Sequence, residues 1–270
     1  MNGIVEIVSI GNELLIGRIS NTNAQWLAER VTRLGGHVRR IGVVGDSLDE
    51  ISSVLEASLM RGTPLILTTG GLGPTFDDLT LEAIARTFGV PLTVNAAALK
   101  MVEEKYRQYG DSVGKEIELT PARLKMATLP EGGKSLRNPV GTAPGVLMVR
   151  GESRIVALPG VPKEMEAIFE ENVEPLVKAA VGSVFVGERS LKVSEIMESA
   201  IAPLIDEVMR DNPHVYIKSH PKASESRPSI ELHLMTVANK RCVGLKRIDV
   251  TAKRIAQLVL ANGGTIHTQS

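Results

Sequence analysis

The chain has 270 residues, which is enough to bury a sizeable core in one or two domains. Lysine and arginine together number 31, as do aspartate and glutamate, so the formal net charge is zero and a surface that coats nucleic acid is disfavoured. The single cysteine, Cys242, excludes an internal disulfide and favours a reducing, cytoplasmic compartment. No run of about 18 apolar residues and no signal-peptide pattern occurs, so we expect a soluble protein without a membrane partner.

The first predicted strand covers residues 4–10 and ends in a glycine and a carboxylate. Open α/β sheets bind their ligands at the carboxyl ends of strands, so Gly11 and Glu13 are candidate ligand contacts. Apolar residues at helical spacing then predict a helix with Asn23 as its N-cap. Asn21 and Asn23 have a second interpretation, as hydrogen-bonding partners for the ribose or ring of a ligand.

The second predicted strand covers residues 38–44 and is followed by Asp46. Ser47 and Glu50 match a capping box at the start of the next helix, which leaves Asp46 without a capping role. In a parallel sheet, Asp46 would lie at the same edge as Glu13 and an aspartate farther along the chain. Acidic groups that converge at one edge predict a metal or phosphate-transfer site.

The most informative stretch is LTTGGLGPTFDDLT, which covers residues 67–80 between a predicted strand and a predicted helix. Glycine lets the backbone approach a ligand closely, and successive N–H groups near a helix N-terminus can hold a phosphate. Two adjacent carboxylates would repel a bare phosphate, so the pattern favours a divalent metal between carboxylate and phosphate. The candidate residues in this stretch are Gly70, Gly71, Gly73, Thr75, Asp77 and Asp78.

A simpler interpretation of the same stretch is a tight turn in which Asp77 or Asp78 caps the following helix. It accounts for one aspartate and leaves the other aspartate and the glycine run unexplained. The stretch matches neither the P-loop, which requires Gly-Lys-Ser/Thr, nor the GxGxxG dinucleotide fingerprint.

Two further helices are predicted after the central stretch. Asn95 is the expected N-cap of the first, and Thr120, followed by a proline at the first helical position, begins the second. The apolar residues expected on the buried side of the first helix are Leu99, Val102, Tyr106 and Tyr109.

A second group of turn residues surrounds a predicted antiparallel hairpin of residues 146–150 and 154–158. The loops are residues 138–145 before the hairpin and residues 159–162 after it. They are either ordinary connections or the rim of a ligand site. The loop residues that we expect to contact a ligand are Thr142, Gly145 and Gly160.

A change in composition near residues 179–183 predicts two domains, residues 1–180 and residues 183–265. The second domain should contain a strand, a helix, two strands and a helix, which makes a small two-layer α+β domain. Its basic residues are offset by acidic ones, and no Gly-x-x-Gly loop of the KH type occurs, so we do not expect nucleic acid as a partner.

Several segments carry a family resemblance when they are taken together. They are IGNELLIGRISNTN at 10–23, VGD at 44–46, TGGLGPTFDDLT at 69–80, GTAPG at 141–145, PGVPKEM at 159–165 and VYIKSHP at 215–221. These segments resemble the CinA (competence/damage-inducible) family and, more broadly, the molybdopterin-binding fold of the MogA and MoaB proteins. The resemblance implies an α/β fold, a three-layer α/β/α sandwich with a mostly parallel sheet, followed by a small α+β domain.

The resemblance also implies a site. The MogA-type aspartates match Asp46 and Asp78, so these two are expected to be catalytic, with Asp77, and to hold Mg²⁺, Mn²⁺ or Co²⁺. Asn12 stands where many members have an aspartate, which removes one possible metal carboxylate. The chain stops at Ser270, so we do not expect the deamidase domain of full-length CinA. The resembling families commonly form homo-oligomers, and we expect one here.

The leading hypothesis follows from the resemblance to CinA, which implies a metal-dependent hydrolase of the pyrophosphate in ADP-ribose or a related nucleotide. Arg18 and Lys163 are candidates to neutralise phosphate charge. The first alternative is a pterin-phosphate-binding protein or adenylyltransferase of cofactor biosynthesis, which would use the same loop and aspartates. A binding module without chemistry is the second alternative.

Overall fold

The computed structural model describes residues 3–114, 118–222 and 229–268. The chain divides into two compact units, Met1–Gly182 and Ser183–Ser270. Each unit has its own hydrophobic core, with two core clusters in the first unit and one in the second.

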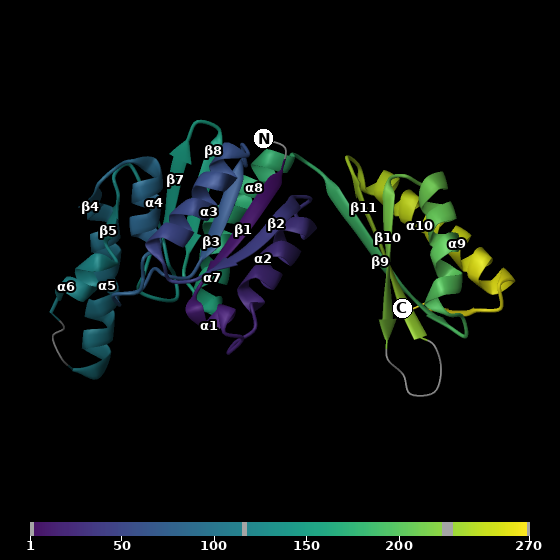
Figure 1. The fold of residues 1–270 in the computed structure, drawn as a ribbon, viewed down its shortest axis with the longest axis horizontal. Coiled ribbons are helices and arrows are strands. Elements are labelled where there is room, and N and C mark those ends of the chain that lie inside the picture. Colours follow the sequence, from purple (N-terminus) through teal and green to yellow (C-terminus); the bar gives the residue numbers. More distant parts are fainter. Residues whose placement is uncertain (1–2, 115–117, 223–228, 269–270) are drawn as a thin grey trace. The chain divides into compact units, whose positions relative to one another are not determined.

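A six-stranded sheet forms the centre of the first unit (Figure 1). Its strands, in spatial order, are β2 (His37–Val44), β1 (Ile4–Ile10), β3 (Leu65–Thr69), β8 (Ser153–Leu158), β7 (Gly145–Arg150) and β6 (Lys134–Leu136). The first four strands are parallel, whereas β7 and β6 each run antiparallel to the preceding neighbour. The loops after β2, β1, β3 and β8 therefore meet at one edge of the sheet.

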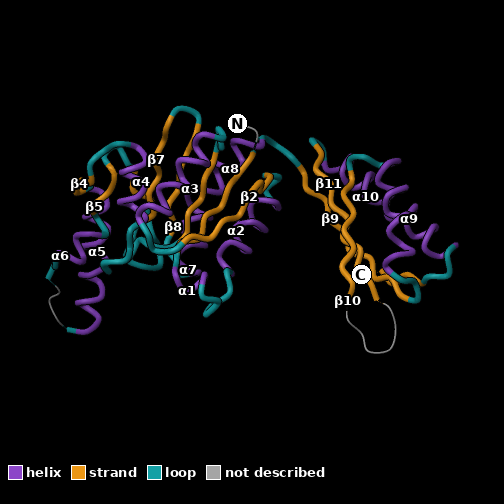
Figure 2. The backbone as a smooth tube through the Cα atoms, viewed as in Figure 1, coloured by secondary structure: helices purple, strands orange, loops and turns teal. Residues whose placement is uncertain are grey.

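Helices cover both faces of this sheet and make three layers (Figures 1 and 2). One face packs against α2 (Thr22–Arg33), α7 (Pro162–Ile168), the π-helical turn η1 (Phe169–Val173) and α8 (Glu174–Val181). The other face packs against α3 (Leu48–Met60), α4 (Thr80–Phe88) and α5 (Ala96–Val113). The short elements are α1 (Asn12–Leu15), α6 (Pro121–Lys125), β4 (Leu92–Val94) and β5 (Thr128–Pro130). The expected α/β/α sandwich with a mostly parallel sheet is confirmed.

Strand β3 illustrates why the sequence specifies this architecture. All five of its residues are buried, and neighbouring side chains point to opposite faces of the sheet. Ile66 belongs to the core under α3 and α4, while Leu67 belongs to the core under α2 and α7. A continuous apolar run is what a strand covered on both faces requires.

Most of the predicted helix starts are confirmed. Side-chain oxygens of Ser47, Asn95 and Thr120 each accept a hydrogen bond from a backbone N–H in the first turn of the following helix. The prediction for Asn23 is wrong, because α2 begins two residues earlier, at Thr22, and the N-cap is Asn21, whose Oδ1 accepts from the Ala24 N–H at 3.2 Å.

The buried side of α5 differs from its prediction at one position. Val102 is fully buried, and Leu99 and Tyr106 pack against the core. Tyr109 is 60% exposed, whereas the next residue, Gly110, is buried, so the buried side of the helix passes beside Tyr109.

The second unit is a four-stranded antiparallel sheet with two helices. The strands, in spatial order, are β10 (Val215–Lys222), β11 (Ser229–Ala238), β9 (Phe185–Ser194) and β12 (Thr265–Thr268). The helices α9 (Glu198–Asp211) and α10 (Arg241–Ala261) share one apolar core with the sheet. The sequence analysis did not predict β12, which follows the glycine turn after α10, nor the three-residue strands β5 and β6.

Among the residues that the structure describes, no helix is both long enough and apolar enough to cross a membrane.

Candidate functional site

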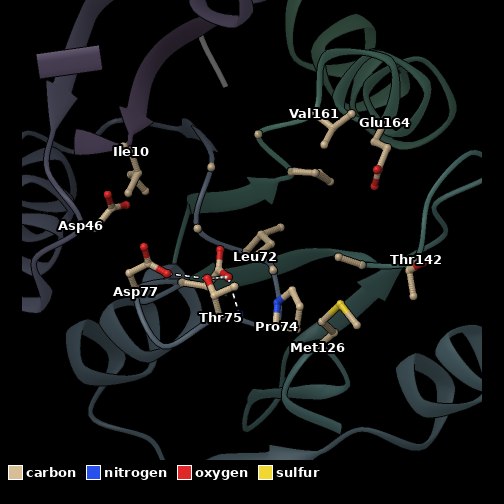
Figure 3. Close-up of a pocket in the computed structure, with 18 of the residues that line it drawn as sticks. Ile10, Asp46, Leu72, Pro74, Thr75, Asp77, Met126, Thr142, Val161 and Glu164 are labelled. Atoms are coloured by element: carbon tan, nitrogen blue, oxygen red, sulfur yellow. Dashed lines mark hydrogen bonds between the residues drawn. The ribbon is translucent and has the colours of Figure 1, made fainter. Parts of the chain in front are cut away.

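The loops at the carboxyl edge of the sheet surround a cavity of about 480 Å³ (Figure 3). They follow β1, β2, β3 and β8, and the loop before β7 completes the wall. Eleven of the residues predicted from the sequence to form a site line this cavity: Gly11, Glu13, Asp46, Gly70, Gly71, Gly73, Thr75, Asp77, Asp78, Thr142 and Gly160.

Backbone hydrogen bonds fix these loops to one another. The Gly11 N–H donates to the Val44 carbonyl at 3.1 Å, which joins the ends of β1 and β2. The Gly70 N–H donates to the Leu158 carbonyl at 3.0 Å, which joins the ends of β3 and β8. The cavity wall is therefore a continuation of the sheet rather than a set of independent loops.

Gly70 is the position where glycine is strictly required. Its φ is +109°, and a Cβ atom there would lie 2.2 Å from the carbonyl oxygen of Ile10. A Cβ on Gly160 would lie 3.5 Å from the Gly70 Cα, so the two glycine-containing loops pass in van der Waals contact. Only a chain without a side chain at residue 70 can bring the β1 and β3 ends this close.

Thr75 connects the two adjacent aspartates. Asp78 Oδ2 accepts hydrogen bonds from the Thr75 N–H at 2.7 Å and from Thr75 Oγ1 at 2.6 Å. Thr75 Oγ1 also lies within hydrogen-bond distance of Asp77 Oδ1. A hydroxyl has a single proton, so it satisfies only one of these carboxylate oxygens at a time. The hydrogen bond from Thr75 lowers the pKa of Asp77, and the charge of Lys125 contributes to the same shift, so Asp77 is a carboxylate at neutral pH.

The interpretation of Asp77 or Asp78 as a helix cap is wrong. Helix α4 begins at Thr80, its N-cap is Leu79, and no side chain accepts a capping hydrogen bond there. The Asp78 side chain bonds back to Thr75 and remains at the cavity wall.

Asp46 is held by Asn12. The Asn12 N–H donates to Asp46 Oδ2 at 2.8 Å, and the Asp46 N–H donates to Asn12 Oδ1 at 3.3 Å. The Asn12 oxygen thus acts as an acceptor, a role that the aspartate common in the resembling family would also perform. Glu50 supports the same turn, since its Oε2 accepts from the Gly45 N–H at 3.1 Å.

All the charged side chains that line the cavity in the described part of the chain are acidic. They are Glu13, Asp46, Asp77, Asp78 and Glu164. Arg18 and Lys163, the predicted phosphate-neutralising residues, do not line it. An anionic ligand in such a cavity requires a cation to offset the carboxylates.

Among the described residues, no three His, Cys, Asp or Glu side chains are arranged to hold one ion. The donor set still fits a hard divalent cation. Mg²⁺ is typically bound through one or two carboxylates and completes its coordination with phosphate oxygens and water.

Two predicted site residues lie elsewhere. Asn23 Nδ2 donates to Thr69 Oγ1 at 2.9 Å and to the Gly160 carbonyl at 2.8 Å, and the residue borders a smaller neighbouring cavity of about 110 Å³. Gly145 begins β7, where a Cβ would lie 3.0 Å from Ile168 and 3.1 Å from the Ala157 carbonyl oxygen. Glycine is required at this position because the strands and the helix pack closely around it.

The sequence analysis missed Glu164 as a site residue. It lies in the first turn of α7, and Figure 3 shows its carboxylate directed into the cavity. Asn138 Nδ2 donates to Glu164 Oε2 at 2.6 Å. The only signal in the sequence was the position of a carboxylate just after the Pro159–Val161 turn. Tyr106 and Met126 also line the cavity and were predicted, at most, as packing residues.

The fold and site define an α/β domain with a candidate ligand cavity at the carboxyl edge of a mostly parallel sheet, between a glycine-rich loop and several carboxylates. The chain belongs to the family described as a probable molybdopterin binding domain, whose model matches residues 6–179.

Several proteins are similar to this chain. A protein from Pyrobaculum arsenaticum is 44% identical over 265 residues, which cover 98% of this chain and 97% of the relative. Protein PAE0875 from Pyrobaculum aerophilum is 46% identical over 260 residues, which cover 96% of this chain and 95% of the relative. A crystal structure of the protein CinA from Thermoplasma acidophilum, described as having unknown function, is 42% identical, with a TM-score of 0.59 and coverage of 65% of this chain and 98% of that chain. These similarities confirm the resemblance to CinA that the sequence motifs indicated.

Proposed function

We propose that the cavity binds a phosphorylated pterin or nucleotide together with a divalent cation, as part of cofactor biosynthesis. The observation that carries this proposal is the charge of the cavity wall. Five carboxylates and, in the described residues, no basic side chain line a cavity that also contains a glycine-rich loop. Such a wall suits a metal–phosphate pair and is unfavourable for a free phosphate.

The family membership supports the choice of ligand. The matching model is described as a probable molybdopterin binding domain, and its residues 6–179 lie within the unit Met1–Gly182 and include all the residues that line the cavity. A cavity of about 480 Å³ is in the range of ordinary small-ligand sites.

The proposal assigns a role to each group. The backbone of Gly71 and Gly73 and the hydroxyl of Thr75 lie where a phosphate would meet the start of α4. Asp46 and Asp78 would hold a Mg²⁺, Mn²⁺ or Co²⁺ ion, which would offset negative charge and polarise a phosphoryl oxygen. Thr75 keeps the Asp78 carboxylate oriented towards the cavity.

Hydrolysis of a phosphoanhydride, as in ADP-ribose, is the second candidate. It is favoured by the presence of carboxylates on separate loops, since Asp46 follows β2 and Asp77 follows β3. One carboxylate could orient a water molecule while others hold the cation. Adenylyl transfer would use the same groups and would additionally require ATP turnover.

The experiment is titration calorimetry of the purified chain with dihydroneopterin triphosphate and with ADP-ribose, in Mg²⁺, in Mn²⁺ and in EDTA. Binding should require the metal. Asp78→Asn, which keeps an acceptor for the Thr75 N–H but removes the charge, should weaken binding roughly tenfold or more. Asp49→Asn is the control, because Asp49 is exposed, lies on α3 and does not line the cavity.

Chromatography of the same mixtures separates the two candidates. Release of AMP from ADP-ribose that is lost in Asp78→Asn would establish hydrolysis. Saturable metal-dependent binding without AMP release would support the binding and cofactor-synthesis function. Binding that is equally tight in EDTA and in Asp78→Asn would contradict the proposed site.

A further inference from the structure

Glu164 lies apart from the other carboxylates of the cavity. Figure 3 shows Glu164 and Val161 on the side of the cavity away from Asp46 and Asp77. Because Glu164 lies on that other side, a role beside Asp46 and Asp78 in holding the cation does not account for it.

The Glu164 carboxylate is held in one orientation by a buried amide. Asn138 is 5% exposed, and its Nδ2 donates to Glu164 Oε2 at 2.6 Å and to the Ala143 carbonyl at 2.8 Å. Asn138 Oδ1 accepts from the N–H groups of Val140 and Gly141 at 3.1 Å and 2.7 Å. Every polar atom of the Asn138 side chain is thus used, and the amide cannot turn without breaking several hydrogen bonds.

Because Gly141 has no side chain, the Glu164 carboxylate has room beside it. A Cβ on Gly141 would be 2.0 Å from Glu164 Oε2 and 2.4 Å from Oε1. Because these are carboxylate atoms at the end of a flexible side chain, a larger residue would displace the Glu164 carboxylate rather than the backbone. The loop before β7 is therefore shaped around Glu164.

Glu164 keeps hydrogen-bonding capacity for a ligand. Its one side-chain partner in the described part of the chain is Asn138, and no Lys, Arg or His there forms an ion pair with it. A carboxylate accepts about four hydrogen bonds, so Glu164 can still accept two adjacent donors in a bidentate arrangement.

The surroundings favour a flat ring as the source of these donors. Val161 lies beside Glu164, and Leu72, Met126 and Ala143 also line the cavity (Figure 3). Apolar side chains around one fixed polar group are typical of a site that covers the faces of a ring and reads its edge.

We propose that Glu164, oriented by Asn138, is the specificity-determining residue that accepts the adjacent N–H and NH₂ of an amino-lactam ring, the edge shared by pterins and guanine. This inference rests on the proposed function, since the phosphates must bind at the glycine-rich loop for the ring to reach Glu164. Adenine presents one donor next to an acceptor, so its lone pair would face a carboxylate oxygen. The site should therefore discriminate against adenine nucleotides.

The test is titration calorimetry in Mg²⁺ with GDP, IDP, ADP and dihydroneopterin triphosphate. GDP and dihydroneopterin triphosphate should each bind roughly tenfold or more tightly than ADP, because a site built to accept two donors rejects a ring that lacks one. IDP keeps the ring N–H but lacks the NH₂, so its affinity should lie between those of GDP and ADP. Comparing the affinity for GDP with that for dihydroneopterin triphosphate shows which of the two rings, guanine or pterin, the site prefers.

The variant Glu164→Gln sharpens the test. Its amide oxygen can still accept from Asn138, which directs an NH₂ group rather than an acceptor into the cavity. GDP and pterin affinity should fall roughly tenfold or more, while ADP affinity should stay unchanged or rise. Glu166→Gln is the matched control, because Glu166 lies on the same helix and does not line the cavity. Thermal unfolding of both variants establishes that they fold.

The remaining outcomes overturn the inference in distinguishable ways. Equal affinity for GDP, IDP and ADP, with binding still dependent on Mg²⁺, would refute the role of Glu164 and leave the proposed function intact. An equal loss for all ligands in Glu164→Gln would assign Glu164 to the phosphate and metal end. A tenfold lower affinity for 2′-deoxy-GDP, added as a further ligand, than for GDP would assign Glu164 to the ribose if this difference disappeared in Glu164→Gln and ADP bound as tightly as GDP. Absence of binding by all four ligands would refute the proposed function itself.

Discussion

Replacing Glu6 by glutamine should destabilise the first unit by about 3 kcal/mol at pH 7. The Glu6 side chain is 2% exposed in β1 and accepts hydrogen bonds from Arg39, Arg61, Ser58 and Thr63. Burial raises the pKa of Glu6, but these hydrogen bonds outweigh it, that of Arg61 most strongly, and lower the pKa from 4.5 to about 2. A difference of this size corresponds to about 3 kcal/mol of stabilisation by the ionised form.

The pH dependence of this effect has a definite sign. Because the pKa of Glu6 is lower in the folded protein than in the unfolded chain, its contribution is complete above pH 4.5. The contribution is lost as the pH falls from 4.5 through about 2, where the folded carboxylate takes up its proton. The difference in the free energy of unfolding between the native chain and Glu6→Gln should therefore be constant from pH 6 to 8 and narrow progressively below pH 4.5.

Urea unfolding followed by tryptophan fluorescence measures this difference for the first unit. Trp26, the single tryptophan, lies in α2 and packs edge-on against Phe169 at 5.4 Å between ring centroids. Asp49→Asn is the control, since its ion pair with Arg86 is exposed and such pairs contribute little. A destabilisation that stays the same from pH 7 to pH 3 would refute the reasoning, because the ionised carboxylate would then not be its source.

Two further substitutions test the packing of the glycine-rich loop and the orientation of Glu164. Gly70→Ala should lower the free energy of unfolding by at least about 1–3 kcal/mol from its backbone conformation alone, and its Cβ would also clash with the Ile10 carbonyl. The variant should also lose ligand binding. The control Gly42→Ala, whose Cβ meets no atom within 4 Å, should be tolerated in the same urea and calorimetry assays. Asn138→Ala should lower the ratio of GDP to ADP affinity, because it frees the Glu164 carboxylate to turn; an unchanged ratio would show that Asn138 stabilises the loop without positioning Glu164.

The central sheet was predictable because its strands carry their own signal. The apolar residues of β1 and β3 are buried on both faces, so they appear in the sequence as short continuous runs bounded by glycine or polar turns. The hairpin of β7 and β8 was recognisable from two apolar runs around Gly151. The strands that were missed, such as β5 and β6, have three residues each, which is too short for a pattern of period two to stand out.

The site was predictable where its residues follow the carboxyl ends of the strands, because these ends meet at one edge of a parallel sheet and bring Glu13, Asp46 and Asp78 to one cavity. Asp77 and Asp78 stand out as a pair, but their competition for the Thr75 hydroxyl required coordinates, and the simpler capping role was equally compatible with the sequence. Glu164 depends on Asn138, which is 26 residues earlier in the chain. A hydrogen bond between two loops at that separation leaves no periodic pattern, so a single sequence cannot reveal it.

The glycine-rich loop carries less functional information than its composition suggests. A Cβ on Gly70 would meet the Ile10 carbonyl, and one on Gly71 would lie 2.3 Å from Thr80 Oγ1, so both glycines are required by the protein's own packing. Gly73 differs, because a Cβ there would lie 2.6 Å from Asp78 Oδ2 and would displace a carboxylate that faces the cavity. A glycine variant that loses binding therefore does not separate misfolding from the loss of a ligand contact. The substitution Asp78→Asn removes only a charge. The carboxylates are thus the residues on which the proposed function must be tested.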